Sequence, residues 1–280
     1  MILFHILILL GLSSLLEAAT AIDPITIAIE QAHTFALKKN RKEACAVLNK
    51  AYTSTASQVR GRSKILETLQ QVSHVFFTDK GQKLFESAQV FAFENPDMAL
   101  TQLREAQTLE DDNTLVLLNL SKVQIAKQDC DSALGVLELA RKMNPQAPAP
   151  AVMELRALLC ANRHEAFKEK AKALASGEKW DQSFSQYLQA QEQLRLNSAH
   201  KAFEMLSKVT EEFPQFPEAH YYLAKAAHLL EKDNSVPLQK YTQLCRSVTI
   251  RERKNFSYEP QLCTHMKEVD DELAATKPEV

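Results

Sequence analysis

Glycine is scarce in this sequence, with 5 residues among 280, and proline occurs only 10 times. After Pro24, each proline falls where a stretch of helical periodicity would begin or end, which is where an α-helix tolerates it. No stretch alternates β-branched and polar residues as a strand does. Together these features predict an all-α fold.

Catalytic and metal-binding signatures are missing as well. The sequence contains no Gly-x-Ser-x-Gly motif, no glycine-rich phosphate loop and no His-Glu-x-x-His helix. Its cysteines and histidines lack the spacing of a zinc site, and His220 and His228 have no evident third ligand. We therefore predict that the protein is not an enzyme and has no catalytic residues, no metal and no cofactor.

An excess of charge of either sign is also absent, since 33 basic residues stand against 35 acidic ones. A nucleic-acid-binding protein would show a basic stripe. The one basic cluster, Arg251 to Lys254, is interrupted by Glu252 and lies between predicted helices, which is typical of a solvated linker. This balance predicts that no nucleic acid is bound.

The first 16 residues, MILFHILILLGLSSLL, are the longest apolar stretch. At about 15 apolar residues this stretch is shorter than the ~20 that span a bilayer. Ala19-Thr20-Ala21 follows with the pattern of a signal-peptidase site, although no lysine or arginine precedes the stretch. We predict a signal peptide over residues 1–21 and a periplasmic or secreted protein. The alternative is an uncleaved membrane anchor with the remainder outside the cytoplasm.

What the sequence does contain is a repeat. A small residue is followed four positions later by a large one and three positions after that by another small one. Two copies of this spacing lie one 34-residue period apart: Ala99, Leu103 and Ala106, then Ala133, Leu137 and Ala140. A tandem helical hairpin produces such a period, because one hairpin cannot bury its apolar face alone. The pattern resembles the tetratricopeptide-repeat (TPR) family, which implies an α-solenoid of about five to six hairpins.

The repeat pattern also suggests an organisation for the chain. We expect a hairpin at 22–56, an extra helix at 57–79, a solenoid at 80–250, and a tail with a short capping helix at 251–280. The extra helix is indicated by the apolar stripe of Ile65, Leu69, Val72 and Phe76. Two repeat phases compete between 148 and 216. We favour units at 148–182 and 183–216 over a unit at 164–197, because the former keeps the last two units in step.

In the TPR family the first helix of each unit lines a concave groove that holds a peptide or a partner's helix. The resemblance therefore implies a mainly apolar and aromatic partner-binding groove, formed by Leu118, Asn119, Lys122, Val152, Met153, Arg156, Tyr187, Tyr221, Tyr222 and Lys225. Lys122, Arg156 and Lys225 occupy equivalent positions and would form a broken basic line that binds a partner's carboxylates. Alternatively, these long side chains only cover apolar surface.

Five cysteines can oxidise if the protein is exported. Cys245 and Cys263 each end a Gln-Leu-Cys triplet, and a disulfide between them would attach the tail to the last full helix. Cys130 and Cys160 are a second candidate pair, since they lie about equally far from the turn near residue 145. Cys45, next to Ala44, is then a buried small residue rather than a nucleophile.

These observations predict an exported adaptor or assembly factor that binds a protein or peptide partner, one with acidic groups if the basic line is functional. A membrane-tethered structural scaffold with an uncleaved N-terminus is the first alternative. An enzyme, the second alternative, would need a polar cleft assembled from separate helices.

Overall fold

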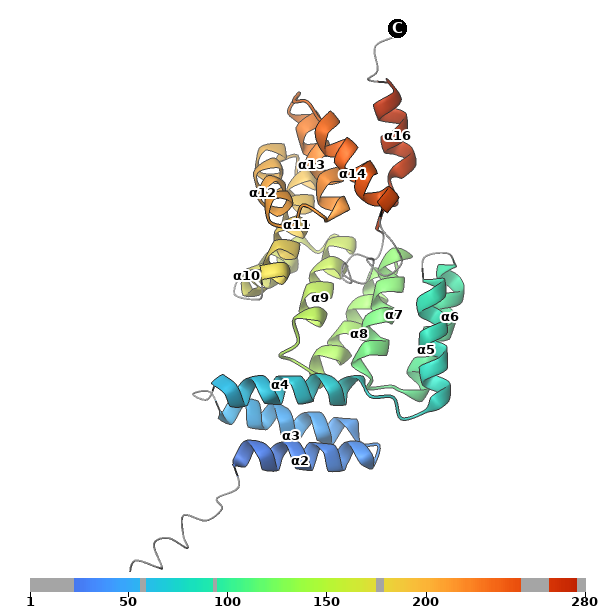
Figure 1. Ribbon diagram of the computed structural model, residues 1–280, viewed down its shortest axis with the longest axis vertical. Coiled ribbons are helices and arrows are strands. Elements are labelled where there is room, and N and C mark those ends of the chain that lie inside the picture. The colour runs from blue at the N-terminus through green and yellow to red at the C-terminus, as the bar shows by residue number, and fades with distance from the viewer. Residues whose placement is uncertain (1–22, 56–58, 93–94, 175–178, 248–261, 276–280) are drawn as a thin grey trace, which may run out of the picture. The chain divides into compact units, whose positions relative to one another are not determined.

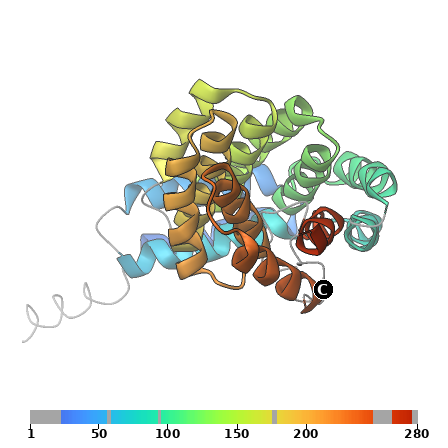
Figure 2. The same cartoon turned by 90° about the horizontal axis from the view of Figure 1, so that it is seen from above.

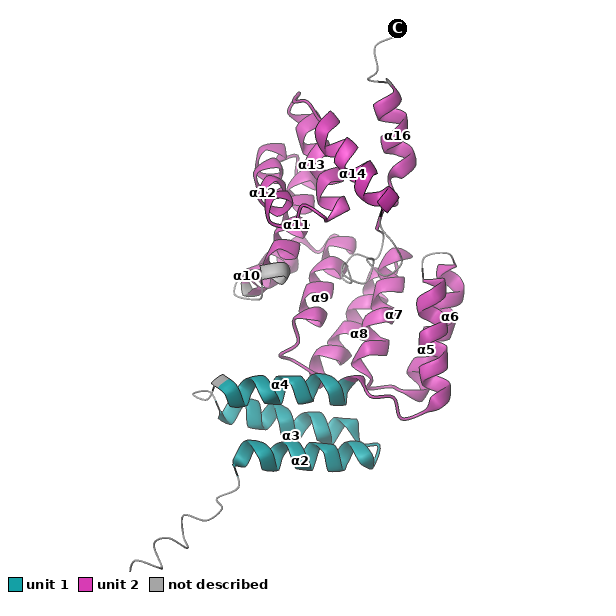
Figure 3. Ribbon diagram, in the orientation of Figure 1, with its two compact units in different colours: residues 1–73 teal, residues 74–280 magenta. Residues whose placement is uncertain are grey.

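The computed structural model describes residues 23–55, 59–92, 95–174, 179–247 and 262–275 (Figure 1). The predicted signal peptide and the basic cluster at 251–254 lie outside these residues. Every regular element within the described ranges is a helix, which confirms the predicted fold class. The chain divides into two compact units, residues 1–73 and 74–280, which are considered separately (Figure 3). No helix of the described ranges is both long enough and apolar enough to cross a membrane.

Unit 1 is a helical hairpin followed by a third helix. The hairpin pairs α2 (Pro24–Leu37) with α3 (Arg41–Ser54). Helix α4 (Val59–His74) lies within the range predicted for the extra helix but ends earlier, so Phe76 of the predicted stripe lies beyond it. Each helix buries residues three or four positions apart, such as Ile65, Leu69 and Val72 of α4, because only one face meets the core.

Unit 2 contains a series of five hairpins within the described ranges, each helix packing on the next (Figure 1). The pairs are α5 (Asp79–Phe91) with α6 (Pro96–Leu109), α7 (Thr114–Ala126) with α8 (Cys130–Met143), α9 (Pro148–Cys160) with α10 (His164–Ala173), α11 (Lys179–Arg195) with α12 (Ala199–Glu212), and α13 (Pro217–Leu229) with α14 (Ser235–Ser247). A last helix, α16 (Met266–Ala275), packs against α14. With the hairpin of unit 1, this confirms the predicted solenoid hairpins, and the pairing of α11 with α12 confirms the favoured repeat phase.

The 34-residue period has a packing cause. Its small residues are fully buried where the second helix of a hairpin meets the first, as Ala99 and Ala133 show. The large residue four positions later, Leu103 or Leu137, is buried beside it. A small side chain lets two helices approach closely, and the larger neighbour fills the space beside the contact.

A second regularity marks the turn inside the hairpins. The residue two positions after a first helix has a positive φ of 55° to 62° and is never glycine: Lys39, Gln128, Asn162, Asn197 and Glu231. The next N–H bonds back to the helix, as from Asp129 N to Gln124 O at 2.8 Å. This geometry is that of a Schellman cap, which satisfies the last carbonyls of the first helix. The last four positions are 34, 35 and 34 residues apart, so the stack absorbs a one-residue insertion between α9 and α11.

The start of unit 2 is fixed by a buried glutamate. Glu110 accepts hydrogen bonds from Phe77 N (2.9 Å), Thr78 N (2.7 Å) and Thr78 Oγ1 (2.8 Å). A Cβ on Gly81 would lie 2.6 Å from Thr78 Oγ1 and 2.8 Å from Glu110 Cγ. Gly81 is therefore required by a close approach between α5 and the end of α6.

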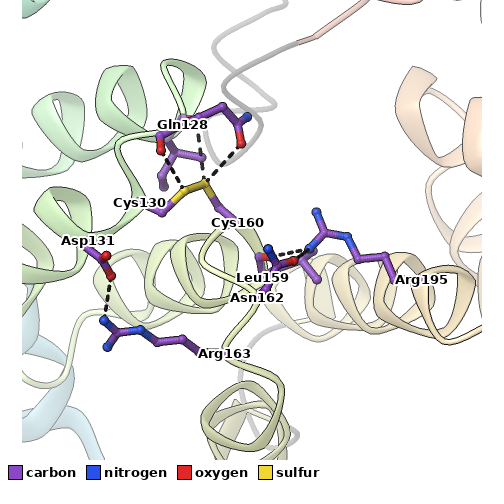
Figure 4. Close-up of a disulfide and its surroundings, with 9 residues drawn as sticks. Gln128, Cys130, Asp131, Leu159, Cys160, Asn162, Arg163 and Arg195 are labelled. Atoms are coloured by element: carbon purple, nitrogen blue, oxygen red, sulfur yellow. Dashed lines mark hydrogen bonds and ion pairs between the residues drawn. A yellow bond between two sulfur atoms is a disulfide. The ribbon is translucent and has the colours of Figure 1, made fainter.

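Both predicted disulfides are present. Cys130–Cys160 joins the first residue of α8 to the last residue of α9, with Cα atoms 5.8 Å apart (Figure 4). An ion pair between Asp131 and Arg163, 2.6 Å long, lies beside it. Cys245–Cys263 has Cα atoms 5.5 Å apart. Cys45 is buried and unbonded, as predicted, and burial raises the pKa of its thiol to about 12, which keeps it protonated and unreactive.

Candidate partner-binding surface

Four helices, α7, α9, α11 and α13, each pack on the next of the set, and we call them the first-helix layer (Figure 2). This layer carries the ten residues predicted to line the groove. Half of them are buried in the protein's own core: Leu118, Val152, Met153, Tyr187 and Tyr221. Val152, Met153 and Tyr187 have no exposed surface, so in this conformation they cannot contact a partner. The prediction that these apolar residues line an open groove is therefore wrong, because they fill the contacts between neighbouring helices.

The other five residues keep exposed surface: Asn119, Lys122, Arg156, Tyr222 and Lys225. Among them Lys122 stands out. It is half-buried on α7, and its ammonium has no hydrogen-bond or ion-pair partner among the residues that the structure describes. Burial lowers the pKa of Lys122 to about 8, because the charged form loses hydration without gaining an anion. A carboxylate at this position would reverse that loss.

Arg156 and Lys225 differ from Lys122. Arg156 Nη1 donates to Gln191 Oε1 at 3.0 Å and so links α9 to α11. Lys225 Nζ donates to Tyr221 OH at 3.2 Å and lies 5.2 Å from the centre of the Tyr221 ring. Of the predicted basic line, two members are thus engaged by the protein itself, and Lys225 lies over an aromatic side chain as the alternative interpretation expects.

The C-terminal end of the layer is covered by the protein's own tail. His265 stacks on Tyr221 with ring centroids 3.9 Å apart, and Tyr221 OH donates to Glu268 at 2.8 Å. Leu262 is buried in the core cluster that contains Tyr187. Burial and the hydrogen bond to Glu268 raise the pKa of Tyr221, so its phenol stays protonated and able to donate.

Helix α16 continues the tail along α14. Its Val269 is fully buried in a cluster with Leu238 and Tyr241. Polar contacts surround this apolar seam: Arg246 pairs with Asp270 at 3.2 Å, and Asn234 Nδ2 donates to Glu272 Oε1 at 2.6 Å. The sequence predicts a tail attached to the last full helix, but it does not predict the contact of the tail with the first-helix layer. The repeated Gln-Leu-Cys triplet was the available signal, because it places Leu262 next to the bridged Cys263.

A separate surface hollow of about 480 Å³ lies between α5 and α6. Its lining residues are Asp79, Lys80, Lys83, Leu84, Ser87 and Gln102. Lys80 pairs with Glu105 at 2.6 Å, and Gln102 Nε2 donates to Ser87 Oγ at 3.0 Å. Within the described ranges, no cluster of histidine, cysteine, aspartate and glutamate side chains has a geometry that would hold a metal ion.

No known protein-family model matches this sequence, and no curated protein matches it. Several solved structures are similar in fold. MamA from Desulfovibrio magneticus RS-1 is 16% identical with a TM-score of 0.44, over 64% of this chain and 98% of that one. A human IFIT1 dimer with m7Gppp-AAAA is 15% identical with a TM-score of 0.48, over 88% of this chain and 67% of that one.

A third structure is a tetratricopeptide repeat protein from Parabacteroides merdae ATCC 43184. It is 13% identical with a TM-score of 0.42, over 89% of this chain and 93% of that one. Identity is low in all three cases. The assignment of tandem TPR-like hairpins therefore rests on the helix pairing and the 34-residue period of this chain itself.

Proposed function

We propose that this protein is an exported adaptor or assembly factor of a cell envelope, which binds a protein or peptide partner on its first-helix layer. The proposal rests on one observation: Lys122 is half-buried, and its ammonium has no partner among the residues that the structure describes. The proposed contact is a carboxylate of the partner, from an acidic side chain or a chain terminus, placed against this ammonium. The near-neutral charge balance favours a protein partner over a nucleic acid.

The energetics of Lys122 support this role. A lysine whose pKa falls from its ordinary value of 10.5 to about 8 is destabilised as a cation in the free protein. The destabilisation amounts to roughly 3 kcal/mol before relaxation and screening are considered, since one pKa unit corresponds to about 1.4 kcal/mol. A bound carboxylate recovers part of this free energy as a charge-assisted hydrogen bond.

A site-specific cross-linking experiment tests the binding surface. A photoreactive amino acid replaces Asn119, which lies on α7 one helical turn before Lys122, in one variant and Lys208, an exposed residue of the second-helix α12, in the matched control. In the native host we expect a discrete cross-linked protein from position 119 and none from position 208. Equal products from both positions, or none from position 119, would contradict the proposed surface.

Two further measurements test the proposed export. N-terminal sequencing of the mature protein should begin at or near Ile22, whereas an intact Met1 would favour the membrane-tethered scaffold. Alkylation of the denatured, unreduced protein should label a single thiol, that of Cys45, because the other four cysteines are paired. Five labelled thiols would contradict an oxidising location.

A further inference from the structure

The described tail, residues 262–275, lies on a surface made of three tyrosines. We call this the tyrosine surface: Tyr221, Tyr222 and Tyr241, from α13 and α14. The tail contacts it through three kinds of group. These are the apolar Leu262, the ring of His265 and the carboxylate of Glu268. Backbone groups contribute too, since His265 N donates to Tyr241 OH at 2.9 Å and Cys263 N donates to Glu218 Oε1 at 2.5 Å.

The tyrosine surface is built without the tail. Tyr222 makes edge-on contact with the buried Tyr187, with centroids 5.7 Å apart, and Tyr187 makes edge-on contact with Phe216, at 4.9 Å. Tyr221 contacts Tyr222 at 5.1 Å and Tyr241 at 5.6 Å. All these rings belong to helices of the hairpin stack. If the tail left, the surface would keep its shape and would present phenol hydroxyls and apolar ring faces.

The tail, in contrast, depends on its attachment. Helix α16 has 10 residues, fewer than an isolated helix needs in water. Cys263 holds a φ of 63°, a backbone region that residues other than glycine, asparagine and aspartate seldom adopt. The Cys245–Cys263 disulfide closes a loop with a sequence separation of 18 residues. In the chain-entropy model, a loop of this size favours the docked tail by a factor on the order of 100.

We propose that the tail is a tethered occupant of the tyrosine surface, and that a partner displaces it when the Cys245–Cys263 disulfide is reduced. The displacing segment has the chemistry of the tail itself: an apolar side chain followed by an acidic amphipathic helix. Arg246, Asn234 and Tyr221 are the groups that would bind its acidic side chains, as they bind Asp270, Glu272 and Glu268 in the tail.

The reduction is a thiol–disulfide exchange with a dithiol reductant. One thiolate of the reductant attacks a sulfur of the disulfide, and the other cysteine leaves as a thiolate that takes up a proton. The second thiol of the reductant then resolves the mixed disulfide. Two electrons pass to the protein, which gains two cysteine thiols, and the reductant becomes a disulfide. Both cysteines are half-buried, so part of the bond is open to attack.

This inference rests on the proposed binding function, and it adds a second, latched surface at the opposite end of the same layer. Its test uses the full-length protein with a Cys245→Ser/Cys263→Ser latch variant. The matched control is Cys130→Ser/Cys160→Ser, which removes the other disulfide and leaves the tail attached. The probe is a fluorescent synthetic peptide of residues 262–275 that carries Cys263→Ser.

Fluorescence anisotropy should show that the peptide binds the latch variant more tightly than the oxidised wild-type protein, by a factor of about 10 to 100. The control variant should match the wild type. Hydrogen exchange should show fast amides over 266–275 in the latch variant and protected ones in the wild type. Equal peptide affinities, or a protected α16 in the latch variant, would overturn the proposal.

A second variant avoids the cysteines altogether. His265→Ala/Glu268→Gln weakens the docked tail while leaving the hairpins and the disulfide in place, so it should increase peptide binding several-fold. An unchanged affinity would contradict the assigned contacts. Cross-linking at position 119 does not involve the tail. A cross-linked partner at that position, together with failed peptide binding, would reject the latch but keep the proposed function.

Discussion

The two ends of the first-helix layer use equivalent residues in different ways. Lys122 of α7 and Lys225 of α13 occupy the same position of their repeats, 103 residues apart. Lys122 is half-buried with no partner in the described part of the protein, whereas Lys225 is exposed, bonded to Tyr221 and beside a docked tail. A repeat position therefore predicts where a side chain projects but does not predict what covers it.

We expect the largest loss of stability when a buried carboxylate at the start of unit 2 is removed, and a much smaller loss when an exposed carboxylate of the tail is removed. Glu110→Ala removes three hydrogen bonds from a side chain that is 2% exposed and leaves two backbone N–H groups without their acceptor. We expect a loss of about 3 kcal/mol in the free energy of unfolding. Glu268→Ala, in the exposed tail, should cost less than about 1 kcal/mol. Chemical denaturation measures both, and similar losses would contradict the distinction.

Two glycines of unit 2 differ in the same way, one at a close contact and one in open space, and substitutions there should have smaller effects on stability. Gly81→Ala should destabilise unit 2 by about 2 kcal/mol, because the new Cβ would lie 2.6 Å from Thr78 Oγ1. Gly135→Ala, on α8, should stabilise it by about 0.5–1 kcal/mol, because nothing lies within 4 Å and alanine is the better helix former. Thermal unfolding of the pair measures the difference. A Gly81→Ala protein as stable as the wild type would show that the packing between Gly81 and Glu110 is not tight.

The pH dependence of partner binding tests the role of Lys122. Lys122 is charged below its pKa of about 8 and loses its charge as the pH rises through that value. Cross-linked yield from a neighbouring probe at Asn119 should therefore fall roughly tenfold between about pH 7 and about pH 9. Lys122→Arg keeps the charge over this range and should abolish the dependence. A dependence that persists in the arginine variant would assign it to another group.

The smallest effect concerns the turns inside the hairpins. Glu231→Gly, at a φ of 55°, should stabilise the protein by about 0.5–1 kcal/mol, because glycine adopts this conformation without a steric penalty. Glu211→Gly, within α12, should instead cost about 1 kcal/mol. Urea unfolding midpoints compare the two variants. A destabilised Glu231→Gly protein would show that the side chain contributes more than the backbone strain costs.

Much of this architecture could be predicted because its causes are local or periodic. The spacing of Ala133 and Leu137 follows from close helix packing, and the position of α4 follows from its apolar stripe. The Cys130–Cys160 pair follows from antiparallel stacking of α8 and α9, and Cys245–Cys263 from its paired sequence context.

The surface was harder to predict. Val152 and Met153 were assigned to a groove, but the way neighbouring first helices pack turns them into the core. The docking of Glu268 on Tyr221 joins residues 47 positions apart, which no repeat pattern specifies. The positive φ values of Gln128 and Glu231 could not be predicted from the sequence, because glycine, the usual residue at such positions, is absent from these turns.

Side-chain NMR titration of the purified protein measures the pKa of Lys122 and so decides whether this position can bind an acidic group. We expect a value of about 8 in the free protein, and an increase when a carboxylate-bearing partner binds. A value near 10.5, the ordinary lysine value, would show a fully solvated ammonium and would contradict the assignment of this position as the binding site for an acidic group.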